Sequence, residues 1–178
     1  MSNYNQISSF IWNVCDDVLR GLFKPHEYGD VILPFTVLRR LDCTLESHKD
    51  EVYEIYEKYK GQVEDPTPII LNKINTNFFN HSKYDLTRLK SDPQNINLNF
   101  QNYIGGYSDN VVEIIENFQF DKPVQKLHKS NRLYQLIDKF TEVDLHPDVI
   151  SNRDMGIIFE ELLRKFSEMS NETSGEHY

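Results

Sequence analysis

The sequence predicts an all-α fold, a multi-helix orthogonal bundle. Along most of the chain, apolar side chains recur at three- and four-residue spacing, as they do on one face of a helix. Glycine, proline and small polar residues interrupt these runs at the places where helices would end. With 39% hydrophobic and 26% charged residues, the composition is that of a globular protein. These observations predict a helical domain with a well-filled core.

Two strong helical patterns open the chain, over about residues 5–22 and 28–45. In the second pattern Pro34 comes early, so the helix either starts at this proline or kinks there. The pattern is apolar on nearly all sides until Arg39 and Arg40. We therefore expect the second helix at the centre of the bundle.

The following stretch is less regular. Ser47 and Asp50 resemble a capping box, which predicts a third helix ending near Tyr59. Residues 61–68 contain Gly61, Pro66 and Pro68 and are expected to form a loop. Residues 69–90 fit a short helix and a small strand pair equally well, because their apolar runs are short and lie among asparagines.

Helical signals return after residue 92. They predict further helices over about residues 95–103, 108–118, 122–129, 131–143 and 151–166. Gly105-Gly106 is expected to form a turn, Ser108 to cap the helix after it, and Ser151 with Asp154 to open the last one. The periodicity places both Leu38 and Phe159 in the core. We assign residues 1–169 to one helical domain and the polar residues 170–178 to a linker.

Charge and hydropathy limit the environment of the protein. The net charge of -9 argues against strong DNA binding by this chain alone, although local basic patches remain compatible with it, and favours a protein-facing role. No segment approaches the roughly 20 apolar residues of a membrane helix, and the N-terminus has no secretory signal pattern. We expect a cytoplasmic protein without a membrane partner.

The sequence contains few motifs that are typical of catalytic, cofactor-binding or metal sites. It contains no dinucleotide-binding, Walker A or esterase-type motif, and its six histidines lie far apart. Cys15 and Cys43 fall within helical patterns and are interpreted as buried free thiols. The adjacent carboxylates at 16–17 and 160–161 point in different directions on a helix and are expected to be solvated. We assign no catalytic residue and no metal site.

Arg39 and Arg40 are the candidate partner-binding residues. They lie at the end of the most apolar helix and are followed by Asp42. They could contact a partner subunit or a phosphate group. Alternatively, they pair with an acidic neighbour inside the domain, and this second interpretation is favoured.

Two segments resemble a known family. The first runs from Phe10 to Cys43. It opens with Phe-Ile-Trp-Asn-Val-Cys-Asp-Asp-Val-Leu-Arg-Gly and continues with Tyr28-Gly29-Asp30, Ile32-Leu33-Pro34 and Leu38-Arg39-Arg40-Leu41-Asp42. The second begins at Leu145-His146-Pro147, continues through residues 151–166 and ends with Asn171-Glu172-Thr173-Ser174-Gly175-Glu176-His177-Tyr178. Together they resemble the N-terminal domain of the modification (M) subunit of type I DNA restriction–modification systems, the HsdM family. We interpret Tyr178 as a boundary within a longer protein.

The resemblance implies a parent enzyme that methylates the N6 atom of a flipped-out adenine with S-adenosylmethionine. Residues 170–178 would lead into its methyltransferase domain, and Glu176, His177 and Tyr178 would border the cofactor site in the parent alone. The Asp-Pro-x-x-Gly-x-Gly and Asn-Pro-Pro-aromatic motifs of the family do not occur in this sequence. We therefore expect the chain by itself to hold no cofactor and to be inactive.

The resemblance also implies partners: a specificity (S) subunit, a second M subunit, a restriction (R) subunit, and DNA in the assembled complex. The domain would dock the S subunit and help to close the complex around DNA, with exposed apolar side chains as anchors. An alternative is a stand-alone helical adaptor without enzymatic context. A small-molecule enzyme is the weakest hypothesis, because nucleophile, metal and phosphate signatures are missing.

Overall fold

The computed structural model describes the backbone of residues 2–176 and the side chains of residues 3–171. The α-helices are α1 Ser2–Val14, α2 Tyr28–Leu45, α3 Lys49–Tyr59, α4 Thr67–Ile74, α5 Leu86–Leu89, α6 Ile96–Gly105, α7 Asp109–Asn117, α8 Asp121–Lys129, α9 Leu133–Phe140 and α10 Asn152–Glu176. A π-helical turn, Cys15–Leu19, extends α1. In this part of the chain the β-structure consists of isolated bridges, such as the one between Asn80 and Tyr107. The predicted all-α bundle is confirmed.

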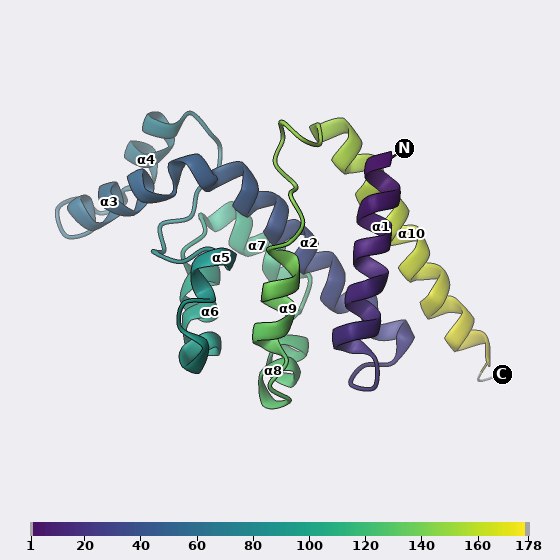
Figure 1. The fold of residues 1–178 in the computed structure, drawn as a ribbon. Helices are drawn as coiled ribbons and strands as arrows, with labels where there is room; N and C mark the ends of the chain where they lie inside the picture. Colours follow the sequence, from purple (N-terminus) through teal and green to yellow (C-terminus); the bar gives the residue numbers. More distant parts are fainter. Residues whose placement is uncertain (1, 177–178) are drawn as a thin grey trace.

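Helix α2 runs through the middle of the molecule, with α1 and α10 at one end and α3 and α4 at the other (Figure 1). Phe35 is fully buried at its centre. Its ring lies 5.6 Å from the ring of Phe100, 5.8 Å from that of Phe120 and 5.6 Å from that of Phe140, measured between centroids. These partners come from α6, the turn before α8, and α9. The expectation that this helix occupies the centre is correct.

Pro34 lies inside α2, because the helix begins at Tyr28. The expectation that the helix starts at the proline is therefore wrong. A proline at this position cannot donate a hydrogen bond to the carbonyl of Asp30, four residues earlier. Burial of the surrounding apolar side chains, among them Ile32 and Phe35, keeps the segment helical despite the missing bond.

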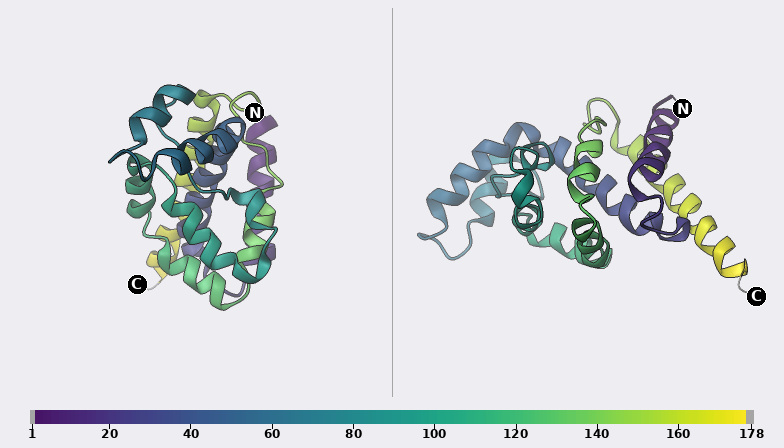
Figure 2. Two further views of the ribbon diagram at one scale, coloured as in Figure 1. Left: turned by 90° about the vertical axis from the view of Figure 1, so that its left-hand side faces the viewer. Right: turned by 60° about the horizontal axis from the view of Figure 1, so that its bottom comes forward.

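Close packing against α2 fixes the position of α10. A Cβ atom at Gly29 would lie 2.9 Å from the Cβ atom of Phe166, so only glycine allows the two helices to approach this closely. The ring of Phe166 also packs against Trp12 of α1, with 5.6 Å between centroids. The C-terminal half of α10 then continues along the edge of the molecule (Figure 2).

Residues 69–90 contain most of α4, an irregular segment and the short helix α5; the strand pair considered for this stretch does not form. Helix α4 ends at Ile74, and its C-cap residue Asn75 adopts the left-handed conformation with φ 54°. The main chain at Phe79 and His81 then bonds to the turn at residues 106–108, through Ser108 N–H to Phe79 O (2.9 Å) and His81 N–H to Gly106 O (2.8 Å). Beneath it lies a second, smaller core, made of Val52, Ile70, Ile74 and Phe79.

Of the capping residues expected from the sequence, one behaves as predicted. The Ser151 hydroxyl accepts a hydrogen bond from the Asp154 N–H at 3.1 Å, at the start of α10. The capping box at Ser47 is wrong, because a 3₁₀ turn over Glu46–His48 precedes α3 and its N-cap makes no side-chain bond. Ser108 does precede α7, but its hydroxyl donates to Asn110 Oδ1 and accepts from the Phe79 N–H.

Helix α10 shows no break at residue 169 and continues to Glu176. Residues 170–176, expected as a linker, are therefore helical. Their role as a connection to a further domain stays a prediction. None of the described helices combines the length and the apolar composition of a membrane span.

Replacement of Leu38 by alanine should test the core. Leu38 is fully buried in α2, so Leu38→Ala should lower the free energy of unfolding by about 2–5 kcal/mol. Phe159 was expected to be equally central, but the structure leaves it half-buried at a groove, and Phe159→Ala should cost less than half as much. Chemical denaturation of both variants measures the difference. Equal losses would contradict these placements.

Candidate functional site

A buried polar network lies where α2 meets α5 and α6. Asp42 is buried, and its Oδ1 accepts a hydrogen bond from the Tyr103 hydroxyl at 2.6 Å. Its Oδ2 accepts one from the Leu86 N–H at 2.8 Å, and the Tyr103 and Tyr107 hydroxyl oxygens lie 2.7 Å apart. Burial raises the pKa of Asp42 to about 6, although the hydrogen bond from Tyr103 opposes this shift. The carboxyl group thus joins three helices inside the core.

Lys49 extends this network to α3. Its buried ammonium group donates to Asn80 Oδ1 at 3.0 Å, and Asn80 Nδ2 donates to the Tyr103 carbonyl at 2.9 Å. Burial lowers the pKa of Lys49 to about 8, while Asp42 and Asp85 oppose the shift. Every polar atom named here has a hydrogen-bond partner within the domain, so the network has the features of one that stabilises the fold.

Sequence reasoning missed this network. One signal was available, because Asp42 lies four residues after Leu38 and three before Leu45, on the face of α2 that is buried. A carboxylate on such a face needs hydrogen-bond donors. The donors come from Leu86 and Tyr103, and no local pattern indicates that they lie next to Asp42.

Arg39 and Arg40 bind the segment that connects α9 to α10. Arg39 Nε donates to the Val143 carbonyl at 2.8 Å. Arg40 Nη1 donates to the carbonyls of Leu145 and Ile150, each at 2.7 Å, and its Nη2 donates to Asn152 Oδ1 at 2.7 Å. Both guanidinium groups thus act inside the domain, on carbonyl and amide oxygens rather than on an acidic side chain. A role in partner binding stays a prediction.

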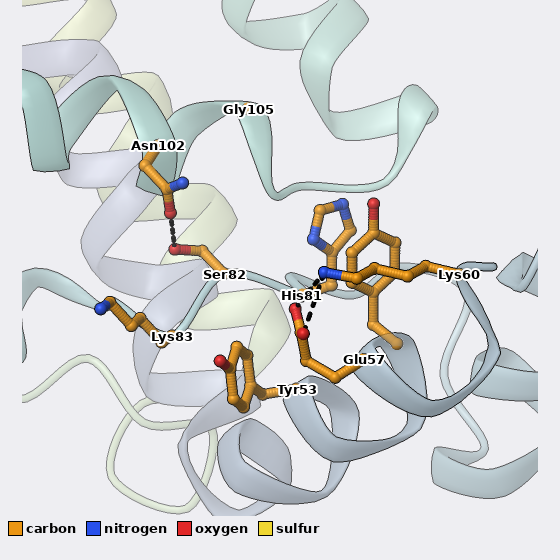
Figure 3. Close-up of a pocket in the computed structure, with 9 residues that line it drawn as sticks. Tyr53, Glu57, Lys60, His81, Ser82, Lys83, Asn102 and Gly105 are labelled. Atoms are coloured by element: carbon orange, nitrogen blue, oxygen red, sulfur yellow. Dashed lines mark hydrogen bonds and ion pairs between the residues drawn. The ribbon is translucent and has the colours of Figure 1, made fainter.

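A polar cavity of about 460 Å³ lies between α3, residues 81–83 and α6 (Figure 3). The rings of Tyr56 and His81 stack on one wall, 3.6 Å apart and nearly parallel, and burial lowers the pKa of His81. Glu57 forms an ion pair with Lys60 at 2.9 Å. The Ser82 hydroxyl donates to Asn102 Oδ1 and not to the histidine, so the cavity lacks an activated nucleophile.

Two grooves flank α10. One lies against α2, has a volume of about 330 Å³ and is lined by Thr36, Val37, Arg40, Leu41, Asn152, Met155, Gly156 and Phe159. The other lies against α1, has a volume of about 460 Å³ and is lined by Asn3, Tyr4, Asp154, Ile157, Ile158 and Glu161. Ile157, in the groove against α1, is 50% exposed, and Leu163 is 41% exposed. Helix α10 therefore presents apolar side chains to solvent between residues 157 and 163.

The cysteines provide no reactive group. Cys15 and Cys43 are buried free thiols, as expected, and burial raises the pKa of the Cys15 thiol to about 12. Among the described residues, no three His, Cys, Asp or Glu side chains gather as metal ligands would. Glu176 is the last residue of α10, but its side chain, together with His177 and Tyr178, lies outside the described residues. Their position beside a cofactor stays a prediction.

Asp42→Asn should change the pH dependence of stability. Because the pKa of Asp42 is about 6 in the folded chain and about 3.8 without burial, the folded chain binds this proton more tightly. The resulting stabilisation is present below about pH 4 and is lost as the pH rises through 6. The free energy of unfolding of the wild type, minus that of Asp42→Asn, should therefore fall between pH 4 and 6.

Chemical denaturation across this pH range measures that difference. Asp109→Asn, at an exposed carboxylate, is the matched control. A constant difference for Asp42→Asn would show that Asp42 titrates alike in the folded and unfolded chains.

Arg40→Ala should destabilise the connection to α10. The change leaves the carbonyls of Leu145 and Ile150 without their charged donor, which should cost about 2–3 kcal/mol. Arg40→Lys should recover less than half of the loss, because an ammonium group cannot reproduce the planar fork. Thermal and chemical denaturation measure both effects. Arg153→Ala, at an exposed arginine, is the control and should change stability by less than about 0.5 kcal/mol.

Comparison with known proteins supplies a family. Residues 7–140 match the family model of the HsdM N-terminal domain. The chain is also 27% identical over 151 residues to an uncharacterized protein of Acanthamoeba polyphaga mimivirus. That alignment covers 82% of this chain and 18% of the relative, so the chain spans about a fifth of the length of this relative. No solved structure matches the chain.

The match covers α2 with its Arg39-Arg40 pair, the α3–α4 end and the helices up to α9. It includes the first of the two segments that carry the resemblance, and the helical architecture agrees with it. The chain belongs to the family of HsdM N-terminal domains, the N-terminal domain of the modification subunit of type I restriction–modification systems.

Proposed function

We propose that this domain is an assembly module that docks the specificity subunit through the outer face of α10. The observation that carries the proposal is the presence of apolar side chains in and beside the two grooves of α10. Ile157 is 50% exposed in the groove against α1, Phe159 is half-buried in the groove against α2, and Leu163 is 41% exposed. Exposed apolar groups that are grouped on one element are typical of docking surfaces.

The shape of this face favours a helical partner. A groove runs along each side of α10, against α2 and against α1. At Gly156 an added Cβ atom would meet nothing within 4 Å, so a partner's backbone can approach α10 closely at this point. Long helices separate the target-recognition domains of S subunits in this family, and a helix lying in a groove is a common docking mode.

A polar atom in the second groove supports the same proposal. The Tyr4 hydroxyl is buried, and among the described residues it has no hydrogen-bond partner. Tyr4 lines the groove between α1 and α10. A partner that fills this groove with a polar group beside the hydroxyl would satisfy it, and buried hydroxyl groups are normally satisfied.

The position of the face depends on Arg40. Its guanidinium group binds the segment before α10 and also borders the groove against α2. Arg40, a candidate partner-binding residue, would thus act indirectly, by holding α10 in the position in which this helix meets the S subunit. Arg39 supports the same connector from the side of α9.

The parent protein is proposed to be a cytoplasmic adenine-N6 DNA methyltransferase that uses S-adenosylmethionine. In the assembled complex it would work with a second M subunit, an R subunit and DNA. The glycine-rich motif with which the family holds this cofactor does not occur in this sequence. The chemistry would therefore lie outside this domain, which would contribute assembly and closure around DNA.

A binding experiment with the S subunit tests the docking face. Ile157→Asp together with Leu163→Asp should weaken binding of the chain to the S subunit from the same genome by about tenfold or more, because charges would replace the apolar anchors. Calorimetry or surface plasmon resonance measures the dissociation constant. The exposed sites leave the core intact.

Ile114→Asp is the matched control, because Ile114 is also 50% exposed but lies on α7. It should leave binding unchanged. Equal weakening by Ile114→Asp, or tight binding by the α10 variant, would move the interface away from α10. If the wild-type chain does not bind any S subunit, the helical adaptor becomes the better hypothesis.

A further inference from the structure

Helix α8 has a basic outer face, which the docking proposal leaves unused. Lys122, Lys126 and Lys129 follow one another at four- and three-residue spacing, so they lie on one side of the helix. Val124 and Leu127 are buried on the other side. Their burial fixes the orientation of α8 and turns the three lysines outward. In Figure 1 this helix lies at the lower edge of the molecule, away from α10.

These lysines stand out against the rest of the chain. Residues 121–132 carry a net charge of +3 in a chain of net charge -9, so the remaining residues total -12. Arg132 is engaged inside the domain, where it donates to the Val18 carbonyl at 2.8 Å. The three exposed lysines are therefore the available cations of this segment.

Ion pairs within the described part of the domain do not account for them. Among the ion pairs of the described residues, none includes Lys122, Lys126 or Lys129. Lys126 lies over the ring of Phe23, 4.7 Å from its centroid. The helix dipole favours cations in the last turn, as at Lys126 and Lys129, but it disfavours a cation in the first turn, where Lys122 lies.

The surroundings of the lysines form an open, mainly basic groove. It is lined by Asp121, Lys122, Gln125, Lys126, Lys129 and Ser130. Glu27 and Asp30 line a second groove on the side of α2, together with Lys122 and Lys126. These two carboxylates reduce the local positive potential but form no ion pair with the lysines. The face should therefore attract polyanions weakly and in a strongly salt-dependent way.

We propose that this face of α8 binds the phosphodiester backbone of duplex DNA. The first and last lysine are about 10 Å apart along the helix axis. Phosphates follow each other about every 3.4 Å of axis in one strand, so the face can meet about three of them. This inference rests on the proposed function, in which the domain helps to close the complex around DNA, and it names the surface that would do so.

The side chains favour duplex over single-stranded nucleic acid. Lysine ammonium groups are point charges that contact phosphates without reading bases. Binding of single strands relies on aromatic side chains on which bases stack. Of the aromatic rings beside this face, Phe23 is buried and covered by Lys126, and Phe118 is partly buried against the core. We therefore expect the lysines of α8 to contact the DNA backbone without sequence preference.

An NMR titration of the 178-residue chain, which has its own core, tests the proposal. A short DNA duplex added at low salt should shift the amide signals of α8 and residues 129–132 more than those of α3 and α4. The logarithm of the binding constant should fall with the logarithm of salt concentration with a slope of about -2.7, as expected for three phosphate contacts. Shifts confined to other helices, or no binding at low salt, would overturn the proposal.

Charge variants provide the second measurement. Lys122→Gln, Lys126→Gln and Lys129→Gln combined should abolish the shifts. The matched control combines Lys58→Gln, Lys73→Gln and Lys83→Gln, at exposed lysines elsewhere in the chain. Both triple variants have a net charge of -12, but the control should keep most of the binding. Equal loss in both variants would show that net charge alone drives association, and the proposal would fail.

Binding to the S subunit separates this inference from the docking proposal. The α8 variant should still bind the S subunit, because its lysines lie outside the grooves of α10. Loss of DNA-induced shifts with intact S-subunit binding supports the role of α8. Loss of both the DNA-induced shifts and S-subunit binding, in a variant whose unfolding transition is unchanged, would contradict the proposal that DNA and the S subunit bind to two separate surfaces.

Discussion

The structure depends on the burial of most of the surface of α2. Its centre is Phe35, whose ring meets three other phenylalanines that come from segments between 65 and 105 residues later in the chain. Each of these contacts removes apolar surface from water, and together they orient α6, the turn before α8, and α9 around one axis. Helices shorter than about 12 residues are marginal alone, so α6 to α9 need this axis to be stable.

The C-terminal half of α2 adds polar contacts to this apolar axis. Asp42 binds the start of α5 and the hydroxyl of Tyr103, while Arg39 and Arg40 bind the connector before α10. These are long-range contacts between charged groups and main-chain or hydroxyl partners. They determine which helices lie next to α2, which apolar burial alone does not specify. The outer helix α10 therefore takes its place from arginines that lie more than 100 residues earlier.

Much of this fold could be predicted from the sequence, and the failures have physical causes. Periodicity located α2 and its central position because a buried helix is apolar on nearly all sides. It placed Phe159 in the core, because residues at a helix–helix groove share the spacing of core residues. It could not choose between helix and strand for residues 69–90, where the outcome depends on the turn at residues 106–108, far along the chain.

Side-chain networks were even less predictable. The sequence marks Arg39, Arg40 and Asp42 as unusual, but their partners are mainly backbone groups, which every residue possesses. The prediction that the arginines pair with an acidic neighbour therefore named the wrong kind of partner. The lysines of α8 are the reverse case. Their spacing can be read from the sequence, but only the structure shows that they take part in none of the ion pairs among the described residues.

The distribution of charge gives the two proposed surfaces different tasks. A domain of net charge -9 is repelled by DNA at a distance, so the contact through three lysines that is expected at low salt is too weak to recruit the domain alone at physiological salt. Apolar docking through α10 does not suffer from this repulsion, since it depends on buried area rather than on charge. Once docking holds the domain beside the duplex, the effective concentration of the lysine face rises and a weak contact suffices. In the proposed complex, the acidic remainder of the domain would then favour release when docking is lost, and the proposed closure around DNA would be reversible.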